Sequence, residues 1–371
     1  MSAAPGVDLK VQPQFGLINL LKAGAAQLIV LHHLAFYGPM SDHVQAILPD
    51  VMDWLYSSAR IAVQVFLVVG GFLAAKSLSP SGQPGHSDPL GAIWRRYLKL
   101  APPFMVATLF AAFASLWAAL WMDHDSISAP ATLGQLSAHA LLLHGVLGYP
   151  SLSAGAWYVA IDFQLYALVV IGLWMAGRFA GNNKASGLMA FITAFGIALS
   201  LLHFNLNSDW DNWALYFFGS YGLGLMAWWA GDPKRKPGAM LLMIVMMMIP
   251  VLCGLVIEFR SRIALALAVA CVLLLFGRIK TTSGGPAWSA INGLARTSYA
   301  VFLIHFPVCL LVNAAFTRFA PPDPVLQAAG MLIAWASSLG AGAAFHHWVE
   351  VPLGRWFSSS RSVPRHASLV S

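Results

Sequence analysis

The residues best suited to chemistry lie in one apolar stretch, residues 22–37, which also carries one cation and two imidazoles. An ionisable side chain at membrane depth is costly, so it indicates a functional site. Lys22 and His33 are eleven residues apart, which on a helix is three turns plus about 20°. They therefore share one helix face, roughly 16 Å apart along the axis, whereas His32 points about 80° away. The spacing predicts a cation near one membrane surface and an imidazole deeper in the membrane.

The elements that must position these residues are transmembrane helices, as the composition indicates. The chain has 371 residues, of which 58% are hydrophobic and only 9% are charged, whereas a soluble domain is nearer 25% charged. The net charge of +7 arises from basic residues in short loops, as the positive-inside rule expects, and does not indicate nucleic-acid binding. The three cysteines lie in apolar runs without metal-ligand spacing, so neither a disulfide framework nor a metal site is predicted.

Ten apolar segments predict an all-α polytopic membrane bundle of about ten transmembrane helices. The predicted spans are 16–37, 57–78, 98–121, 155–176, 187–204, 212–230, 239–257, 262–278, 295–317 and 327–348. The run 133–149 is apolar but short, and we expect it to lie at the interface or to re-enter the bundle. We expect one membrane domain over residues 1–371, with a polar leader over 1–14 and a mobile tail over 358–371. No cleavable signal peptide is predicted.

Loop charges predict the orientation of the bundle. Basic residues cluster in alternate loops, whereas the intervening loops carry aspartates. Cytoplasmic loops are enriched in Lys and Arg, so ten spans place every basic cluster, together with both termini, on the cytoplasmic side. The short 258–262 connection, with Arg260 and Arg262, is the one misfit, because it falls on the outer side.

This orientation assigns depths to the ionisable residues within the spans. Lys22 lies near the cytoplasmic surface, and His33 lies more than halfway toward the outside. His305 lies about ten residues into the ninth span, and Asp162 lies about seven residues into the fourth span from the outside. Two histidines and one carboxylate can therefore converge in the outer half of the bundle, whose inner mouth carries Arg and Lys.

Six short patterns occur in order between Lys22 and Trp356. They are Lys22 and His33 with ten residues between them, FLVVGGFL at 66–73, RRYLKLAPP at 95–103, WYVAIDFQLY at 157–166, SYAVFLIHFP at 298–307 and EVPLGRW at 350–356. In these patterns the chain resembles the integral-membrane acyltransferase type 3 family, bacterial enzymes that O-acylate sugars and other hydroxyl substrates. Three positions depart from the family pattern: Gly70 stands where Ser is usual, Asp162 where Glu is common, and Phe302 where Tyr is usual.

The resemblance implies an activity, a location and partners. The expected reaction is transfer of an acyl group, most commonly acetyl, from cytoplasmic acyl-CoA to a hydroxyl of a sugar, glycan or lipid-linked glycan. The expected location is the bacterial inner membrane, and the expected partners are the lipid bilayer, acyl-CoA and the acceptor. Acyl-CoA serves as donor substrate, and no permanently bound cofactor is expected. The sequence does not identify the acceptor, the length of the acyl chain or the oligomeric state. It also does not decide between direct transfer and transfer through an acyl intermediate.

Three residues are the candidates for catalysis. O-acylation requires removal of a proton from the attacking hydroxyl, and imidazole has a pKa near the operating pH, so His33 suits the role of general base. A packing histidine bonded to a backbone carbonyl is the alternative, and the neighbouring His32 keeps the choice of base open. His305 would complete the acceptor site or stabilise the developing oxyanion. Asp162 would orient His33 or bind acceptor hydroxyls.

Further residues are the candidates for binding the two substrates. For the phosphates of acyl-CoA the candidates are Lys22, Arg95, Arg96 and Lys99. The alternatives are a snorkelling anchor for the lysine and a purely topological role for the basic loop. For the acceptor the candidates are Trp157, Tyr158 and Tyr166, although aromatic residues also form belts at membrane interfaces. Glu350 and Arg355 are interpreted as a structural tie.

Two other functions compete with the enzyme hypothesis. Buried ionisable residues also mark ion pathways, so a proton-coupled transporter with a His/Asp relay is the main alternative. That hypothesis predicts internal repeats and paired broken helices, and the sequence shows no internal repeat of fixed period. The other alternative is an inactive relative that only carries or binds glycan.

Overall fold

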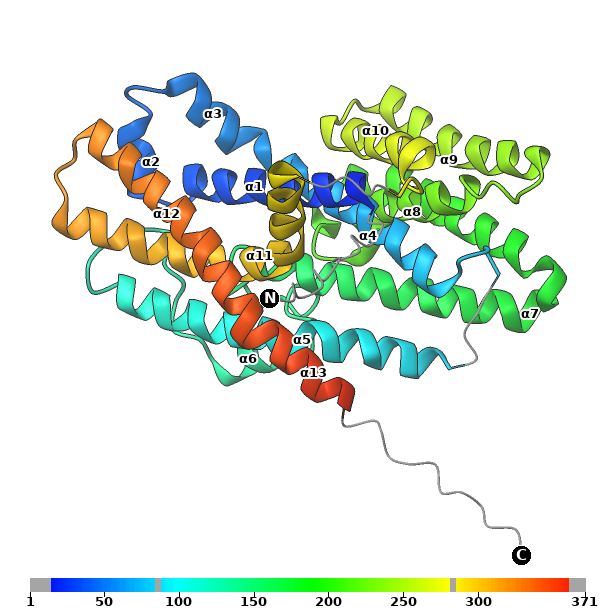
Figure 1. The fold of residues 1–371 in the computed structure, drawn as a ribbon, viewed down its shortest axis with the longest axis horizontal. Coiled ribbons are helices and arrows are strands. Elements are labelled where there is room, and N and C mark those ends of the chain that lie inside the picture. The colour runs from blue at the N-terminus through cyan, green and yellow to red at the C-terminus, as the bar shows by residue number, and fades with distance from the viewer. Residues whose placement is uncertain (1–14, 84–87, 281–284, 360–371) are drawn as a thin grey trace, which may run out of the picture.

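The computed structural model describes residues 15–83, 88–280 and 285–359, so the predicted leader and residues 360–371 of the predicted tail lie outside the described residues. Within these ranges every regular element is a helix, which confirms the all-α bundle (Figure 1). The α-helices are α1 (Gly16–Phe36), α2 (Pro39–Val44), α3 (Pro49–Ser57), α4 (Val63–Leu78), α5 (Pro89–Ala118), α6 (Leu133–Ala140), α7 (Ala156–Leu202), α8 (Ala214–Ala230), α9 (Pro237–Ile257), α10 (Ser261–Phe276), α11 (Pro286–Phe319), α12 (Pro324–Phe345) and α13 (Val351–Ser359). Short 3-10 helices η1 (Ala59–Ala62), η2 (Phe204–Leu206) and η3 (Ser208–Trp210) and a π-helical turn, η4 (His346–Glu350), complete the fold.

The starts of α5 and α12 follow directly from local sequence. Each helix begins with a proline placed directly after an aspartate. The Asp88 side chain accepts a hydrogen bond from the Gly91 N–H at 2.8 Å, and the Asp323 side chain accepts one from the Leu326 N–H at 2.9 Å. These caps satisfy N–H groups that have no partner within the helix, and proline has no N–H to satisfy. The start of α5 lies nine residues before the predicted span, so the RRYLKLAPP motif is helical.

The predicted spans correspond to helices throughout. Eight helical segments of the described chain are long and apolar enough to cross a bilayer. The other two predicted spans, 212–230 and 262–278, correspond to α8 and α10, which have 17 and 16 residues. In the run 133–149 only the eight-residue α6 is α-helical, which is too short to cross. The cytoplasmic location of both termini stays a prediction.

Helix α7 covers two of the predicted spans. At 1.5 Å per residue a straight helix of its 47 residues would be roughly 70 Å long, far more than a bilayer is thick. It contains the apolar segment Ala156–Ala180 and most of a second one, Lys184–Leu206, which extends through η2. In Figure 1 the green ribbon reverses direction between them at the right-hand end of the molecule. The basic residues Arg178 and Lys184 lie beside this reversal.

Helix α8 forms the centre of the bundle. All of its residues except Leu215 are buried, as expected for a helix that is apolar on every side. It crosses α4 at a point where both helices carry glycine. A Cβ atom on Gly71 would collide with the carbonyl oxygen of Tyr221, and one on Gly224 would collide with that of Val68. Small residues at such crossings let two membrane helices approach closely.

Helix α1 lies against α11 and beside η1, α3 and α4. Its C-terminal half carries His32 and His33, and the facing part of α11 carries the SYAVFLIHFP motif. This packing brings the first and the fifth of the family-like patterns together, although they are about 270 residues apart in sequence.

Candidate active site

The first contact at the site joins His33 of α1 to His305 of α11. Nδ1 of His33 lies 2.6 Å from Nε2 of His305, and the two rings are nearly coplanar, with 6° between their planes. His305 is fully buried, whereas His33 is half-buried. The structure therefore brings together the two histidines that the sequence predicted to converge.

The hydrogen bonds around this pair determine where the protons lie when both rings are neutral. Nδ1 of His305 lies 3.1 Å from the carbonyl oxygen of Val301, and a carbonyl only accepts, so this nitrogen carries the proton. Nε2 of His305 is then an acceptor, and the Nδ1–H of His33 donates to it. Nε2 of His33 is left unprotonated and makes no hydrogen bond within the described residues. A neutral imidazole with one free lone pair is what a general base requires.

His32 has a different partner. Its Nδ1 donates to the carbonyl oxygen of Leu55 in α3 at 2.8 Å. A carbonyl holds the ring in place but cannot take over a proton, whereas the partner of His33 is a second imidazole that can. This contrast favours His33 as the base, a choice that helical phase and motif spacing favoured but did not settle.

Both histidines of α1 line a cavity of about 890 Å³, within the range of small-molecule sites. Its wall includes His33, Trp157 and Phe302, together with segments that the charge pattern places on the outer side: Ser57 to Gln64, Asp125 to Ser128, Ser208 to Asp211 and Phe259 to Arg262. We call this space the outer cavity. Its contents would have direct access to the ring of His33.

The three aromatic candidates for acceptor binding lie in three different environments in the structure. Trp157 lines the outer cavity and packs against Phe217 at 5.3 Å between ring centroids. Tyr158 lies between Phe66 and Phe302 inside the bundle and is not part of the cavity wall. Tyr166 lies two turns further along α7 and contacts Arg96, so only the tryptophan keeps a position suited to the acceptor.

Asp162 forms an ion pair with Arg96 of α5. The guanidinium of Arg96 also lies 5.1 Å from the centroid of the Tyr166 ring. Asp162 therefore contacts neither His33 nor His305, and the expectation that it orients His33 does not match its position. Within the described chain, Nε of Arg96 and the hydroxyl of the nearby Tyr221 are buried without a hydrogen-bond partner. The ion pair joins α5 to α7.

The remaining cations lie elsewhere on the bundle. Arg95 and Lys99 are exposed and share one face of α5, four residues apart, while Arg96 turns inward. Electrostatic interactions connect Lys22 of α1 with Lys99 and with Glu350. Of the four cations predicted to bind the donor, Arg95 and Lys99 are exposed, Lys22 is partly buried, and Arg96 is partly buried and paired with Asp162.

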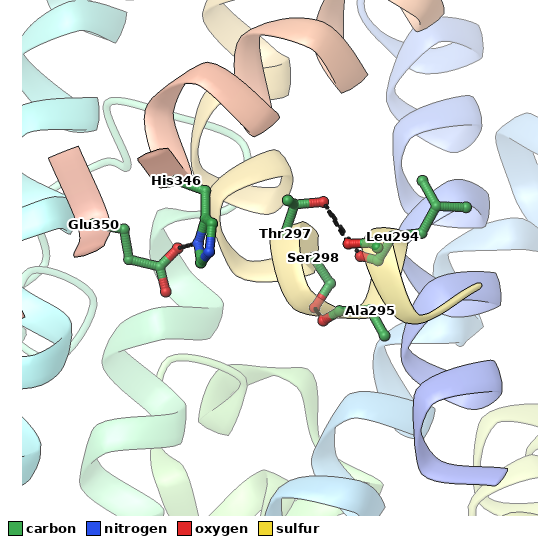
Figure 2. Close-up of polar contacts among 7 residues, drawn as sticks. Leu294, Ala295, Thr297, Ser298, His346 and Glu350 are labelled. Atoms are coloured by element: carbon green, nitrogen blue, oxygen red, sulfur yellow. Dashed lines mark hydrogen bonds and ion pairs between the residues drawn. The ribbon is translucent and has the colours of Figure 1, made fainter. Parts of the chain in front are cut away.

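Glu350 belongs to a pair that the sequence did not predict. Nδ1 of His346 donates to its carboxylate at 2.7 Å, and both residues lie on the π-helical turn η4 (Figure 2). Close by in the same view, the hydroxyls of Thr297 and Ser298 donate to carbonyls one turn earlier in α11. The EVPLGRW pattern thus starts with a carboxylate that is fixed in orientation.

The family is established by a match over most of the chain. A family model described as an acyltransferase domain, acyltransferase 3, covers residues 16–343. The chain belongs to the acyltransferase 3 family. This confirms the sequence resemblance, and it makes the chain an acyltransferase whose apolar helices form a multi-pass membrane protein.

One curated relative is similar to part of this acyltransferase. Regulator of hypoxia-inducible factor 1 from Caenorhabditis elegans is 26% identical over 164 residues, which is 44% of this chain and 32% of that protein. The match thus spans about a third of that relative's length. No solved structure matches the chain.

The acyltransferase contains a second pair of histidines that the sequence analysis did not single out as a site. His139 of α6 and His144 are both fully buried, and their rings stack with centroids 4.0 Å apart. Nδ1 of His139 donates to the Gln135 carbonyl, and Nε2 accepts from the Leu152 N–H. Neither ring nitrogen of His144 has a partner among the described residues. Burial and the neighbouring imidazole lower the pKa of His144 to about 3.

Proposed function

We propose that this acyltransferase moves an acyl group from cytoplasmic acyl-CoA to a hydroxyl of a sugar, glycan or lipid-linked glycan at the bacterial inner membrane. The observation that carries the proposal is the His33–His305 pair, because it leaves one unprotonated imidazole nitrogen on a residue that lines the outer cavity. The proposed acyl group is acetyl, the commonest version that the family resemblance implies.

The proposed chemistry is a direct transfer. The acceptor hydroxyl oxygen attacks the thioester carbonyl carbon, the new C–O bond forms, and the C–S bond breaks. Nε2 of His33 takes the hydroxyl proton and passes it to the departing thiolate, so the products are the ester and free coenzyme A. His305 accepts the Nδ1–H of His33 throughout, which fixes the tautomer and shares the positive charge that develops on the ring.

The proposed donor site consists of a lysine on the N-terminal half of α1 and two exposed cations on α5. Lys22, Arg95 and Lys99 would bind the phosphates of the coenzyme, since cations of this kind form strong hydrogen bonds with phosphate oxygens. Lys22 and His33 share one face of α1, roughly 16 Å apart along the axis. The thioester would therefore extend along this face toward His33. Arg96 is proposed to brace the bundle through Asp162 rather than to bind phosphate.

The test is acceptor-dependent release of coenzyme A by the purified protein in lipid nanodiscs. Acetyl-CoA is supplied with a panel of hydroxyl acceptors, and free thiol and ester product are measured together. The proposal predicts equal amounts of thiol and ester, and thermal stabilisation of the protein by acetyl-CoA through preferential binding to the folded state. It is wrong if acetyl-CoA neither stabilises the protein nor releases thiol with any acceptor. Heat-inactivated protein in the same nanodiscs controls for spontaneous thioester hydrolysis.

A further inference from the structure

The outer cavity carries an excess of arginine on the side of the membrane where the charge pattern predicts few cations. Arg60, Arg260 and Arg262 all line it. Arg260 lies in the short connection between α9 and α10, and Arg262 lies in the first turn of α10. Both belong to the segment 258–262, which contradicts the positive-inside rule. Cations that oppose the topology signal need another explanation, and their position in the wall of the cavity offers one.

Arg260 is buried and bonded only to neutral oxygens. Its side chain is 8% exposed. Nη1 donates to the backbone and side-chain oxygens of Asn205 at 3.0 and 2.6 Å, and Nη2 donates to the carbonyls of Leu201 and Gly254. These bonds tie the end of α7 to the end of α9, so Arg260 has a structural role. None of these bonds is to a charged group, and Glu258 is the acidic side chain that interacts electrostatically with Arg260.

Arg262 forms only long hydrogen bonds within the described residues. Nη2 lies 3.3 Å from both oxygens of Asn205, and the guanidinium lies 5.1 Å from the centroid of the Tyr216 ring. Its Nε is buried and has no hydrogen-bond partner within the described residues. Stacking on the tyrosine holds the guanidinium in a fixed plane, and Nη1 makes no hydrogen bond within the described residues. A buried donor without a partner requires an explanation, and at Arg262 it stands beside a guanidinium in the cavity wall.

The acidic residues of the cavity do not neutralise these arginines. Asp125 and Asp211 also line the wall. Within the described chain, the ion pairs are Arg96–Asp162 and His346–Glu350, and none involves a residue of the outer cavity. Arg60, on η1, is exposed and likewise has no ion-pair partner within those ranges. The cavity thus presents two guanidiniums with unused donors, beside the imidazole of His33.

We propose that the outer cavity selects acceptors that carry an oxyanion, a carboxylate or a phosphate, near the hydroxyl that is acylated. Arg262 and Arg60 bind this anion, and Arg260 is a positioning residue that holds the start of α10, which carries Arg262. Guanidinium groups bind carboxylate and phosphate through paired N–H donors, and the low dielectric of a partly enclosed cavity strengthens such bonds. This inference rests on the proposed function only in taking the outer cavity as the acceptor site.

The test compares charged and neutral sugars as ligands of the full chain in nanodiscs. The first pair is trigalacturonate and neutral galactotriose, and the second pair is galactose 1-phosphate and galactose. Binding is measured by calorimetry at two salt concentrations. We expect the anionic member of at least one pair to bind tenfold or more tightly than its neutral partner, with weaker binding at high salt. The pair that discriminates identifies carboxylate or phosphate as the recognised group.

Variants assign this preference to the proposed arginines. Arg262→Gln and Arg60→Gln should each lower the affinity for the anionic sugar tenfold or more, and Arg262→Lys should restore part of it. Arg318→Gln is the matched control, because Arg318 is an exposed cation at the outer end of α11 and does not line the cavity. Thermal unfolding of each variant checks the fold. Equal binding of anionic and neutral sugars, or unchanged binding by Arg262→Gln in a folded protein, overturns the inference.

The outcomes also separate this inference from the proposed function. If the wild type binds the anionic sugars through Arg262 but turns over no acyl-CoA, the anion subsite stands and the proposed donor is wrong. If it acylates neutral sugars as well as charged ones, the proposed function stands and the anion subsite is wrong.

Discussion

Two pairs of histidines lie inside this bundle, and they differ in how their rings meet. In the His33–His305 pair the rings are joined edge to edge by an N–H···N hydrogen bond of 2.6 Å. In the His139–His144 pair the rings are stacked face to face, with centroids 4.0 Å apart, and His139 directs both nitrogens to backbone groups. The first pair can pass a proton from ring to ring, whereas the second cannot.

The pairs also differ in their access to ligand. His33 lines the outer cavity, whereas neither His139 nor His144 is part of its wall. Burial of a histidine is therefore no sign of catalysis by itself. What makes His33 a candidate base is one unprotonated nitrogen on a residue of the cavity wall, held in its tautomer by a second ring.

The largest expected effect in this comparison is on turnover. Replacing His33 by Gln should lower the rate of acyl transfer by roughly 10²–10⁴, because the attacking hydroxyl loses its general base. His139→Gln, a change of the same type at the other pair, should leave the chemical step nearly unchanged once folding is matched. The measurement is acetyl-CoA turnover at saturating acceptor, with thermal unfolding as the control. Full activity of His33→Gln would move the role of base to His32.

A second large effect is expected at the charged pair, Arg96–Asp162, on stability instead of turnover. Asp162→Asn leaves a guanidinium without its counter-charge inside the bundle, which should cost about 3–5 kcal/mol in the free energy of unfolding. The double variant Arg96→Leu/Asp162→Leu should recover most of that loss, because no unpaired charge remains. Unfolding in bicelles measures both, and Asp123→Asn, at an exposed loop carboxylate, is the control. A fully stable Asp162→Asn protein without turnover would instead assign the carboxylate to the chemistry.

An intermediate effect is expected from His305, which acts through His33. Gln at position 305 offers an oxygen that can accept the Nδ1–H of His33, so it keeps the tautomer but cannot share a proton. We expect a loss of about 10–100-fold for His305→Gln, as for other residues that orient a functional histidine, and a larger loss for His305→Leu. The pH profile of kcat/KM distinguishes this role from a structural one, since both variants should shift its acid limb. An unchanged profile with lower rate would show that His305 only supports packing.

Features that depend on local sequence could be predicted, whereas contacts between distant residues could be predicted only in part. The ten apolar segments and the short run 133–149 were predicted well, because hydropathy and length alone decide them. Convergence of His33 and His305 was predicted from depth, since two residues at one depth in a bundle can meet. The partner of Asp162 was not predictable, because rotation of α7 about its axis decides whether the carboxylate faces α1 or α5, and packing sets that rotation.

The roles of the two arginines near α10 and of Gly70 could not be predicted from the sequence either, each for a different physical reason. The misfit of Arg260 and Arg262 was visible in the loop charges, but its meaning depended on a cavity that only the assembled bundle forms. Gly70 looked like a simple departure from the family pattern. In the structure a Cβ atom there would lie 3.2 Å from the Tyr221 ring and 3.3 Å from a carboxylate oxygen of Asp162. A serine at that position would therefore press directly against the charged pair.

The smallest expected effect concerns the pH dependence of stability at the second histidine pair. Because the pKa of His144 is about 3 in the folded protein and near 6.5 in the unfolded chain, the unfolded chain binds more protons between these values. Stability should therefore fall as the pH falls below 6.5, by up to about 1.4 kcal/mol per unit from this group. His144→Phe removes the titrating group and keeps a ring that can stack on His139 and Phe104.

This variant should unfold a few degrees higher than the wild type at pH 5 and differ less at pH 7.5, with acyl transfer at neutral pH unchanged. Thermal unfolding across pH 4.5–8 measures the difference, and His43→Phe, at a partly exposed histidine of α2, is the control. If His144→Phe unfolds at a lower temperature than the wild type by the same amount at every pH, the second pair is needed for packing and has no acid sensitivity of its own. A loss of neutral-pH turnover in a stable His144→Phe protein would contradict the distinction between the two pairs, because it would assign a catalytic role to the pair outside the cavity.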